Sequence, residues 1–391
     1  MFKAIVSLAF FFFMHTAAAS ESPRPFVFLE GEIFHQYQQR ASVYLKTNKL
    51  WVNEEDQARE LAAVMPFELI PGSSQCEDQQ SIGILLSHGL SDSPFSMRSI
   101  ASALQAACYY VRVLLLPGHG TKAEDLLEVS RDDWRDTFRY AAKDFKSEVD
   151  ILYVGGFSTG GALATEYAWN HPDDVSGVLL LSPIFKINSG IDWLAPWLSL
   201  VKDWLDHEAT DDFAKYASIP LPAIAEVYRL SKEVRNLVLG GPKSLPVFIA
   251  LSEDDQTVDS AVTQQVFQEG MLSENSRMLL YSLGGGNTGD RRVTQYHSSW
   301  PERKILGMSH MAVHGSPDNP YYGADGEYRV CGWHISDKTL YEACRSDLDN
   351  WFGERSDILL EKSAHAARLS WNPHFSELVQ SIDFFLQSNA Q

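Results

Sequence analysis

Six short apolar runs, several of them separated by helical patterns, constrain the fold of this chain most strongly. Each run is almost continuously hydrophobic, as strands are when a sheet is covered on both faces. The runs occupy residues 81–87, 110–116, 150–156, 175–182, 245–251 and 277–283. A further strand is predicted near ERKILGM, at 302–308. Strands alternating with helices predict an α/β fold with a mainly parallel central sheet flanked by helices.

Amphipathic patterns predict the helices that connect and cover these strands. They span residues 93–107, 132–147, 260–272 and, near the end of the chain, 374–388. Two further helical patterns, at 28–49 and 53–65, precede a possible edge strand at 66–71. We interpret residues 20–80 as an N-terminal helical extension whose sequence indicates no function.

Two long stretches interrupt the alternation, at about 185–244 and about 315–372. Connections between sheet strands are normally short, and a long excursion usually covers a site. We therefore expect both stretches to be insertions on one domain that spans residues 81–391.

The sequence Gly156-Phe157-Ser158-Thr159-Gly160 matches G-x-S-x-G between a predicted strand and a predicted helix. So sharp a turn strains the serine, and a side chain at either flanking position would collide with neighbouring backbone. The hydroxyl then projects near a helix N-terminus, whose dipole favours developing negative charge. The alternative is a glycine-rich turn with a chance serine. The context predicts that Ser158 is a nucleophile.

A serine nucleophile needs a general base within hydrogen-bonding reach. His310 follows the strand predicted near ERKILGM directly and is our candidate, with His314 as its rival. The two histidines share the spacing of a helical zinc pair. Met311 follows the first histidine where such metalloproteases have a glutamate, so we predict no metal and no other cofactor.

The base needs an acidic group to orient it. Asp255 follows the run at 245–251 and is our candidate. The competing carboxylates are those of Glu253, Asp254 and Asp259. The site also needs donors for an oxyanion. We expect these to be the backbone N–H groups of Thr159 and of Leu90, although the turn at Leu90 could be an ordinary one.

The motifs SHGL, PGHG, Asp133-Trp134, GFSTGG, DQTVD and SHM occur in this order. Together they resemble the α/β-hydrolase superfamily, in the branch of monoacylglycerol lipases, carboxylesterases and serine-aminopeptidase-like proteins. The resemblance covers about residues 81–310 plus the final helix. It implies a catalytic triad of Ser158, Asp255 and His310, an oxyanion hole at Leu90 and Thr159, and a cap at about 185–244.

The cap segment IDWLAPWLSLVKDWLDH carries apolar residues at 193, 197, 200, 201, 204 and 205, which would form one helical stripe. Such a stripe is more often the core of a cap than the wall of a ligand site. If part of it faces the nucleophile, Trp193 and Trp197 are the substrate-binding residues that we expect.

Residues 1–19 have the layout of a secretory signal peptide, with one lysine, an apolar run and the small residues Ala17-Ala18-Ala19. A membrane anchor is the alternative, but the run is too short to span a bilayer. In an oxidising compartment the four cysteines can form disulfides, with three possible pairings. We favour Cys76–Cys108, since each lies just before a predicted strand, and Cys331–Cys344, since both lie in one insertion.

The formal charge of −19 disfavours nucleic acid and anionic membrane surfaces as partners. Together these observations predict an exported serine hydrolase, periplasmic or secreted, that cleaves small carboxylic esters or lipids. The alternatives are a peptidase, amidase or thioesterase with the same triad, or a non-catalytic binding protein on a hydrolase scaffold.

Overall fold

The structure is a computed structural model that describes residues 25–72, 76, 80–205, 207–208, 211–284 and 289–390. The predicted signal peptide lies outside the described residues.

The central sheet has eight strands in the order β1-β3-β2-β4-β5-β6-β7-β8. All neighbouring pairs are parallel except β1 and β3, so the predicted edge strand is confirmed. The strands are β1 (Phe67–Leu69), β2 (Ile82–Ser87), β3 (Tyr110–Leu114), β4 (Ile151–Phe157), β5 (Gly177–Leu181), β6 (Val247–Ser252), β7 (Arg277–Ser282) and β8 (Val293–His297).

The sequence prediction of the last strand of this sheet, at 302–308, was wrong. The eighth strand is β8, whose burial alternates only weakly and which carries no apolar run. ERKILGM contributes only the two-residue strand β9 (Ile305–Leu306), which lies in a separate three-stranded sheet. An edge strand faces solvent on part of its surface, so hydrophobicity alone does not reveal it.

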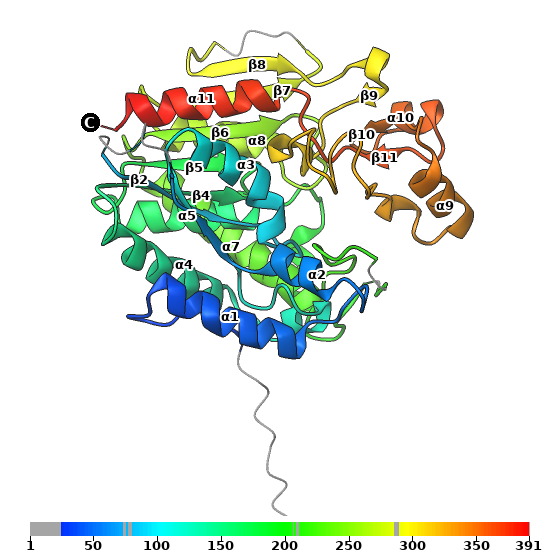
Figure 1. The fold of residues 1–391 in the computed structure, drawn as a ribbon. Helices are drawn as coiled ribbons and strands as arrows, with labels where there is room; N and C mark the ends of the chain where they lie inside the picture. Colours follow the sequence, from blue (N-terminus) through cyan, green and yellow to red (C-terminus); the bar gives the residue numbers. More distant parts are fainter. Residues whose placement is uncertain are drawn as a thin grey trace, which may run out of the picture.

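Helices cover both faces of the sheet (Figure 1). One face packs against α3 (Pro94–Ala106) and α11 (Phe375–Ser388). The other face packs against helices from the rest of the chain. These are α1 (Phe34–Asn48), α4 (Arg131–Lys146), α5 (Thr159–Asn170), α7 (Leu221–Gly240) and α8 (Ser260–Gly270). The predicted architecture, a mainly parallel sheet flanked by helices on both faces, is confirmed.

The N-terminal extension packs closely on the sheet domain. Phe34 and Tyr37 of α1 are buried in the same hydrophobic core as Trp134 of α4. The Tyr37 hydroxyl donates a hydrogen bond of 2.7 Å to the carbonyl of Leu115. Helix α2 (Gln57–Val64) follows and contacts α3. The extension therefore completes the core instead of forming an independent unit.

The segment expected to present one helical stripe does not form a continuous helix. Among its described residues, it contains a 3-10 turn (Asp192–Leu194) and the short helix α6 (Ala195–Leu198). Trp193 is 54% exposed and Trp197 is 68% exposed, so neither indole lies in the core of a cap. Pro196 removes one backbone donor within this segment, and it favours a helix start over a helix interior.

The second insertion is organised around the three-stranded sheet. Strand β10 (Phe352–Gly353) pairs in parallel with β9 and with β11 (Ala367–Arg368). Helices α9 (Lys338–Ser346) and α10 (Asp357–Lys362) flank it. In Figure 1 this unit, drawn in orange, lies to the right of the main sheet.

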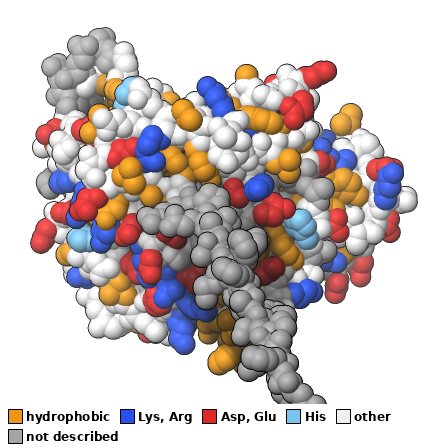
Figure 2. Space-filling model, turned by 90° about the horizontal axis from the view of Figure 1, so that it is seen from below, with side chains coloured by type: hydrophobic (Ala, Val, Ile, Leu, Met, Phe, Trp, Pro, Cys, Tyr) orange, Lys and Arg blue, Asp and Glu red, His pale blue; other side chains and the backbone are white. Residues whose placement is uncertain are grey.

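Both predicted disulfides are confirmed, Cys76–Cys108 and Cys331–Cys344. On the face shown in Figure 2, acidic and basic side chains alternate with scattered hydrophobic ones. Among the described residues, no helix is both long enough and apolar enough to cross a bilayer.

Candidate active site

Ser158 lies at the junction of β4 and α5, where the chain turns sharply from strand to helix. Its backbone has a φ of 54° and a ψ of −113°, a conformation that is strained for any residue with a side chain. Backbone hydrogen bonds hold it there, including one of 3.2 Å from the N–H of Ala162 to the Ser158 carbonyl. The Ser158 N–H donates to the carbonyl of Leu181 at 3.0 Å, and its carbonyl accepts from the N–H of Ile184 at 3.1 Å.

The flanking glycines allow this turn to pack against β2. A Cβ atom on Gly156 would lie 2.5 Å from the carbonyl oxygen of Ser87, and one on Gly160 would lie 2.3 Å from the same oxygen. Real Cβ atoms do not approach backbone oxygen so closely. Both positions therefore require glycine, and the steric reason predicted from the motif is correct.

Asp255 and His310 form a buried pair. The Nδ1 atom of His310 lies 2.6 Å from Oδ2 of Asp255. The other carboxylate oxygen, Oδ1, accepts from the N–H groups of Thr257 at 2.7 Å and Val258 at 2.9 Å. Three donors thus fix the carboxylate in place. An N–H at Nδ1 donating to Asp255 leaves Nε2 of His310 as the hydrogen-bond acceptor.

The competing carboxylates have other partners. Asp254 accepts from the N–H of Met308 at 3.0 Å. Asp259 caps the N-terminus of α8 and pairs with Lys186 at 2.7 Å. Glu253 is exposed. The structure therefore brings Asp255, and none of these three, to His310.

The rival histidine, His314, is buried against the ring of Phe157. The ring of His314 lies 4.2 Å from that of Phe157, and burial lowers the pKa of His314 to about 3. In the described part of the chain, its Nδ1 atom has no hydrogen-bond partner. Within the same residues, no cluster of three or more His, Cys, Asp or Glu side chains could hold a metal ion.

Ser158 and His310 lie at the same edge of the sheet. The ring of Phe157, which precedes the serine, lies 4.7 Å from the ring of His310. The carbonyl of Leu181 accepts the hydrogen bond from the N–H of Ser158. The next residue, Ser182, donates a hydroxyl hydrogen bond of 3.3 Å to the carbonyl of His310. These shared neighbours tie the loops of the two residues together.

The loop after β2 borders Ser158. A Cβ atom on Gly89 would lie 3.0 Å from the Cβ of Ser158, so Leu90 follows the point of closest approach. Among the hydrogen bonds of the described residues, none is donated by the N–H of Leu90 or of Thr159. These are the two donors that the sequence predicted for an oxyanion hole.

Two buried histidines brace this loop. Nε2 of His88 accepts from the N–H of Leu116 at 3.0 Å, and Nε2 of His119 accepts from the N–H of Ser91 at 3.1 Å. Their Nδ1 atoms lie 2.8 Å from the carbonyl of Gly89 and 3.0 Å from that of Pro117. Each ring is therefore a neutral imidazole that connects two loops.

A cavity of about 450 Å³ lies between the segment 205–224 and residues of the second insertion. Its wall combines aromatic with charged side chains, namely Tyr216, Tyr328, Trp333, Tyr341, Glu208, Asp211, Asp212, Lys215 and Arg368. Ser158, Asp255 and His310 do not line it. Trp193 and Trp197 are absent from the residues that line it. Their role in substrate binding stays a prediction.

Sequence reasoning missed Glu354, which accepts a hydrogen bond of 3.2 Å from the N–H of His310. It also missed Arg368, which pairs with Glu354 at 2.8 Å. Each is a single charged residue in an insertion outside the recognised motifs, so no spacing or periodicity could have identified it.

Comparisons with known proteins show what this chain is similar to. The model of the hydrolase family described as serine aminopeptidase, S33, matches residues 79–218. A thermostable monoacylglycerol lipase from Bacillus sp. (strain H-257) is 27% identical over 193 residues, which are 48% of this chain and 76% of that protein. The matched family segment includes Ser158 but ends before Asp255 and His310.

Two solved structures illustrate the likeness of the fold. One, from work on two metagenome-derived lipolytic enzymes, is 24% identical with a TM-score of 0.48, covering 55% of this chain and 86% of its own. The other is a soluble variant of monoglyceride lipase from Saccharomyces cerevisiae. It is 16% identical with a TM-score of 0.45, and the match covers 56% of this chain and 82% of that one.

The sheet order, the strained turn at Ser158 and the family match give this protein the α/β-hydrolase fold. Within that superfamily, its sequence is similar to the branch of monoacylglycerol lipases and esterases.

Proposed function

We propose that this enzyme is a serine hydrolase that cleaves carboxylic esters, with Ser158, His310 and Asp255 as its catalytic triad. The observation that carries the proposal is the fixed pair of His310 and Asp255 at the sheet edge where the strained Ser158 turn lies. A serine, an imidazole and an orienting carboxylate in such an arrangement perform acyl transfer.

In the proposed reaction, Nε2 of His310 accepts the hydroxyl proton as Ser158 attacks the ester carbonyl. The N–H groups of Leu90 and Thr159 donate to the oxyanion that forms. His310 then returns the proton to the leaving alcohol, and water releases the acyl group by the same steps. Asp255 holds the imidazole in the Nδ1–H tautomer.

The proposed substrate class rests on the relatives. The similar proteins include a monoacylglycerol lipase. We propose short- or medium-chain acyl esters or monoacylglycerol-like lipids, with no cofactor.

A fluorophosphonate probe tests the nucleophile directly. The intact protein should be labelled, and Ser158→Ala should not. Absence of labelling of the folded wild-type protein would support the alternative of a non-catalytic binding protein.

A second assay separates ester from amide hydrolysis. We expect p-nitrophenyl esters of increasing chain length to be cleaved and aminoacyl-naphthylamides to be left intact. Faster cleavage of the amides would favour the peptidase alternative that the family description suggests.

We also propose that the protein is exported to the periplasm or beyond. Two disulfides support an oxidising compartment, and the layout of residues 1–19 supports a cleaved signal. The mass of the mature protein should correspond to cleavage after Ala19. Recovery of the full-length chain from the cytoplasm with reduced cysteines would contradict export.

A further inference from the structure

The second insertion delivers one acidic side chain to the loop that carries His310. Strand β10 pairs with β9 in the register Phe352↔Ile305 and Gly353↔Leu306. Glu354 follows β10 just as residues 307–310 follow β9. The small sheet therefore fixes Glu354 alongside the segment that ends at His310.

Glu354 is 4% exposed, and its carboxylate accepts from several donors. Its Oε2 atom accepts from the N–H of His310 at 3.2 Å and from Nη2 of Arg368 at 2.8 Å. The N–H of Gln256 lies at 3.5 Å from the same oxygen. One oxygen atom thus connects the histidine loop, the aspartate loop and β11.

Arg368 reaches the aspartate loop from the other side. Its Nη2 atom also donates to the Thr257 hydroxyl at 2.9 Å. Thr257 is one of the two residues whose N–H groups hold Oδ1 of Asp255. The Glu354–Arg368 pair therefore contacts the supports of both His310 and Asp255.

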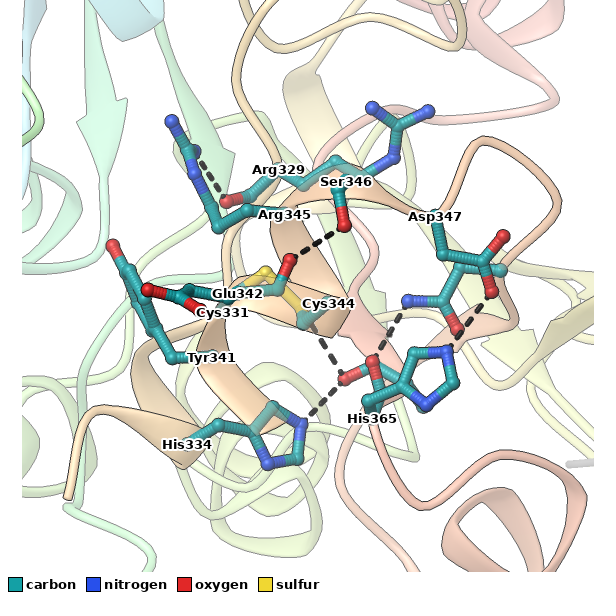
Figure 3. Close-up of a disulfide and its surroundings, with 12 residues drawn as sticks. Arg329, Cys331, His334, Tyr341, Glu342, Cys344, Arg345, Ser346, Asp347 and His365 are labelled. Carbon is teal, nitrogen blue, oxygen red and sulfur yellow. Dashed lines mark hydrogen bonds and ion pairs between the residues drawn. A yellow bond between two sulfur atoms is a disulfide. The ribbon is translucent and has the colours of Figure 1, made fainter. Parts of the chain in front are cut away.

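The Cys331–Cys344 disulfide, which Figure 3 shows near His334 and His365, lies next to the chain that pairs with Arg368. Val330 bridges to Arg368, and the next residue, Cys331, is bonded to Cys344 of α9. The carbonyl of Ala366 lies 2.9 Å from Nε2 of His334 and 3.8 Å from Sγ of Cys344. The disulfide therefore links α9 to the chain just before His334, and both contact Ala366, which directly precedes β11.

The Glu354 side chain is 3% exposed and that of Arg368 is 19% exposed. Apolar residues often give equal or greater stability than an ion pair removed from water, so stability alone does not account for this pair. We propose that Glu354 and Arg368 are positioning residues that hold the His310 and Asp255 loops in register and set the charge around the imidazole.

This inference rests on the proposed function. It predicts that the two charges act on the catalytic imidazole in opposite directions. Glu354→Gln keeps an oxygen acceptor but leaves Arg368 unneutralised, which disfavours the imidazolium. Arg368→Met leaves the carboxylate unneutralised, which favours it. The other ionisable groups around the pair remain the same in every variant, namely Asp254, Asp255, His314 and Lys215.

The test is the pH profile of kcat/KM on a p-nitrophenyl ester. In Glu354→Gln we expect the acid limb to shift to lower pH by about half a unit or more, and in Arg368→Met to shift to higher pH. The double variant should lie between them. Each single variant should also lose about tenfold or more in kcat with a smaller change in KM, because the loops lose register.

Two controls keep the outcomes distinct. Glu342→Gln removes an exposed carboxylate of α9 that pairs only loosely with Lys338, and it should change neither the profile nor kcat. Ser158→Ala should abolish turnover, and if it does not, the proposed function itself fails. If Ser158→Ala is inactive while both folded single variants keep the wild-type acid limb or move it in the same direction, the positioning role is wrong.

Discussion

Acidification should destabilise this fold through the two histidines that brace the loop after β2. Burial lowers the pKa of His88 to about 4, and burial together with the neighbouring His88 lowers that of His119 to about 3. An unfolded chain protonates both rings below its ordinary pKa of about 6.5. The folded chain does not, so the unfolded state binds more protons and stability falls as pH falls from 6.5 toward about 4.

The size of the effect follows from linkage. A pH of 5 is about 1.5 units below the pKa of each ring in the unfolded chain and above the pKa of that ring in the folded protein. Each therefore costs about 2 kcal/mol of unfolding free energy, and the two together cost about 4 kcal/mol. A loss of that size is a large share of the roughly 5–15 kcal/mol that stabilises a typical fold.

Urea unfolding at pH 7 and pH 5 measures this loss. In His119→Gln, whose amide oxygen can still accept from the N–H of Ser91, the difference between the two pH values should shrink by about 2 kcal/mol. His35→Gln is the matched control, because His35 is an exposed histidine of α1. An unchanged difference in His119→Gln would refute the argument that buried neutral rings cause the acid sensitivity.

Three further changes test the site and its supports. Gly160→Ala should destabilise the fold and abolish probe labelling, since its Cβ would clash with the carbonyl of Ser87; a thermal melt and a labelling gel measure both. Asp255→Asn should lower kcat by about a thousandfold or more with an unchanged circular dichroism spectrum, because the imidazole loses its tautomer. Replacing Cys331 and Cys344 by serine should cost about 3 kcal/mol in urea unfolding, as expected for a loop of 13 residues.

The fold was predictable where a single segment carries its own signal. β4, Ser158 and α5 are contiguous, and their glycines are required by contacts with β2 that the G-x-S-x-G pattern already implies. Both disulfides were predictable from position along the chain. β8 was not, because a half-exposed edge strand has no continuous apolar run.

Among the acidic residues at 253–259, the sequence could favour Asp255 but not settle the choice. All four carboxylates lie within one loop after β6, and composition does not distinguish them. The structure does, through hydrogen bonds. Asp254 and Asp259 each bind a backbone N–H elsewhere, at Met308 and Val262. Only the Asp255 side chain turns one oxygen to its own loop and the other to His310.

The Glu354–Arg368 pair marks the limit of what sequence reasoning could reach. Its members come from one insertion, yet they act on loops about 45 and 110 residues away, at His310 and Thr257. Contacts of that kind depend on the register of β9, β10 and β11, strands of only two residues each. Strands so short have no periodicity to detect. An insertion outside the recognised motifs thus supports the residues inside them, and variation there should alter catalysis without touching the triad.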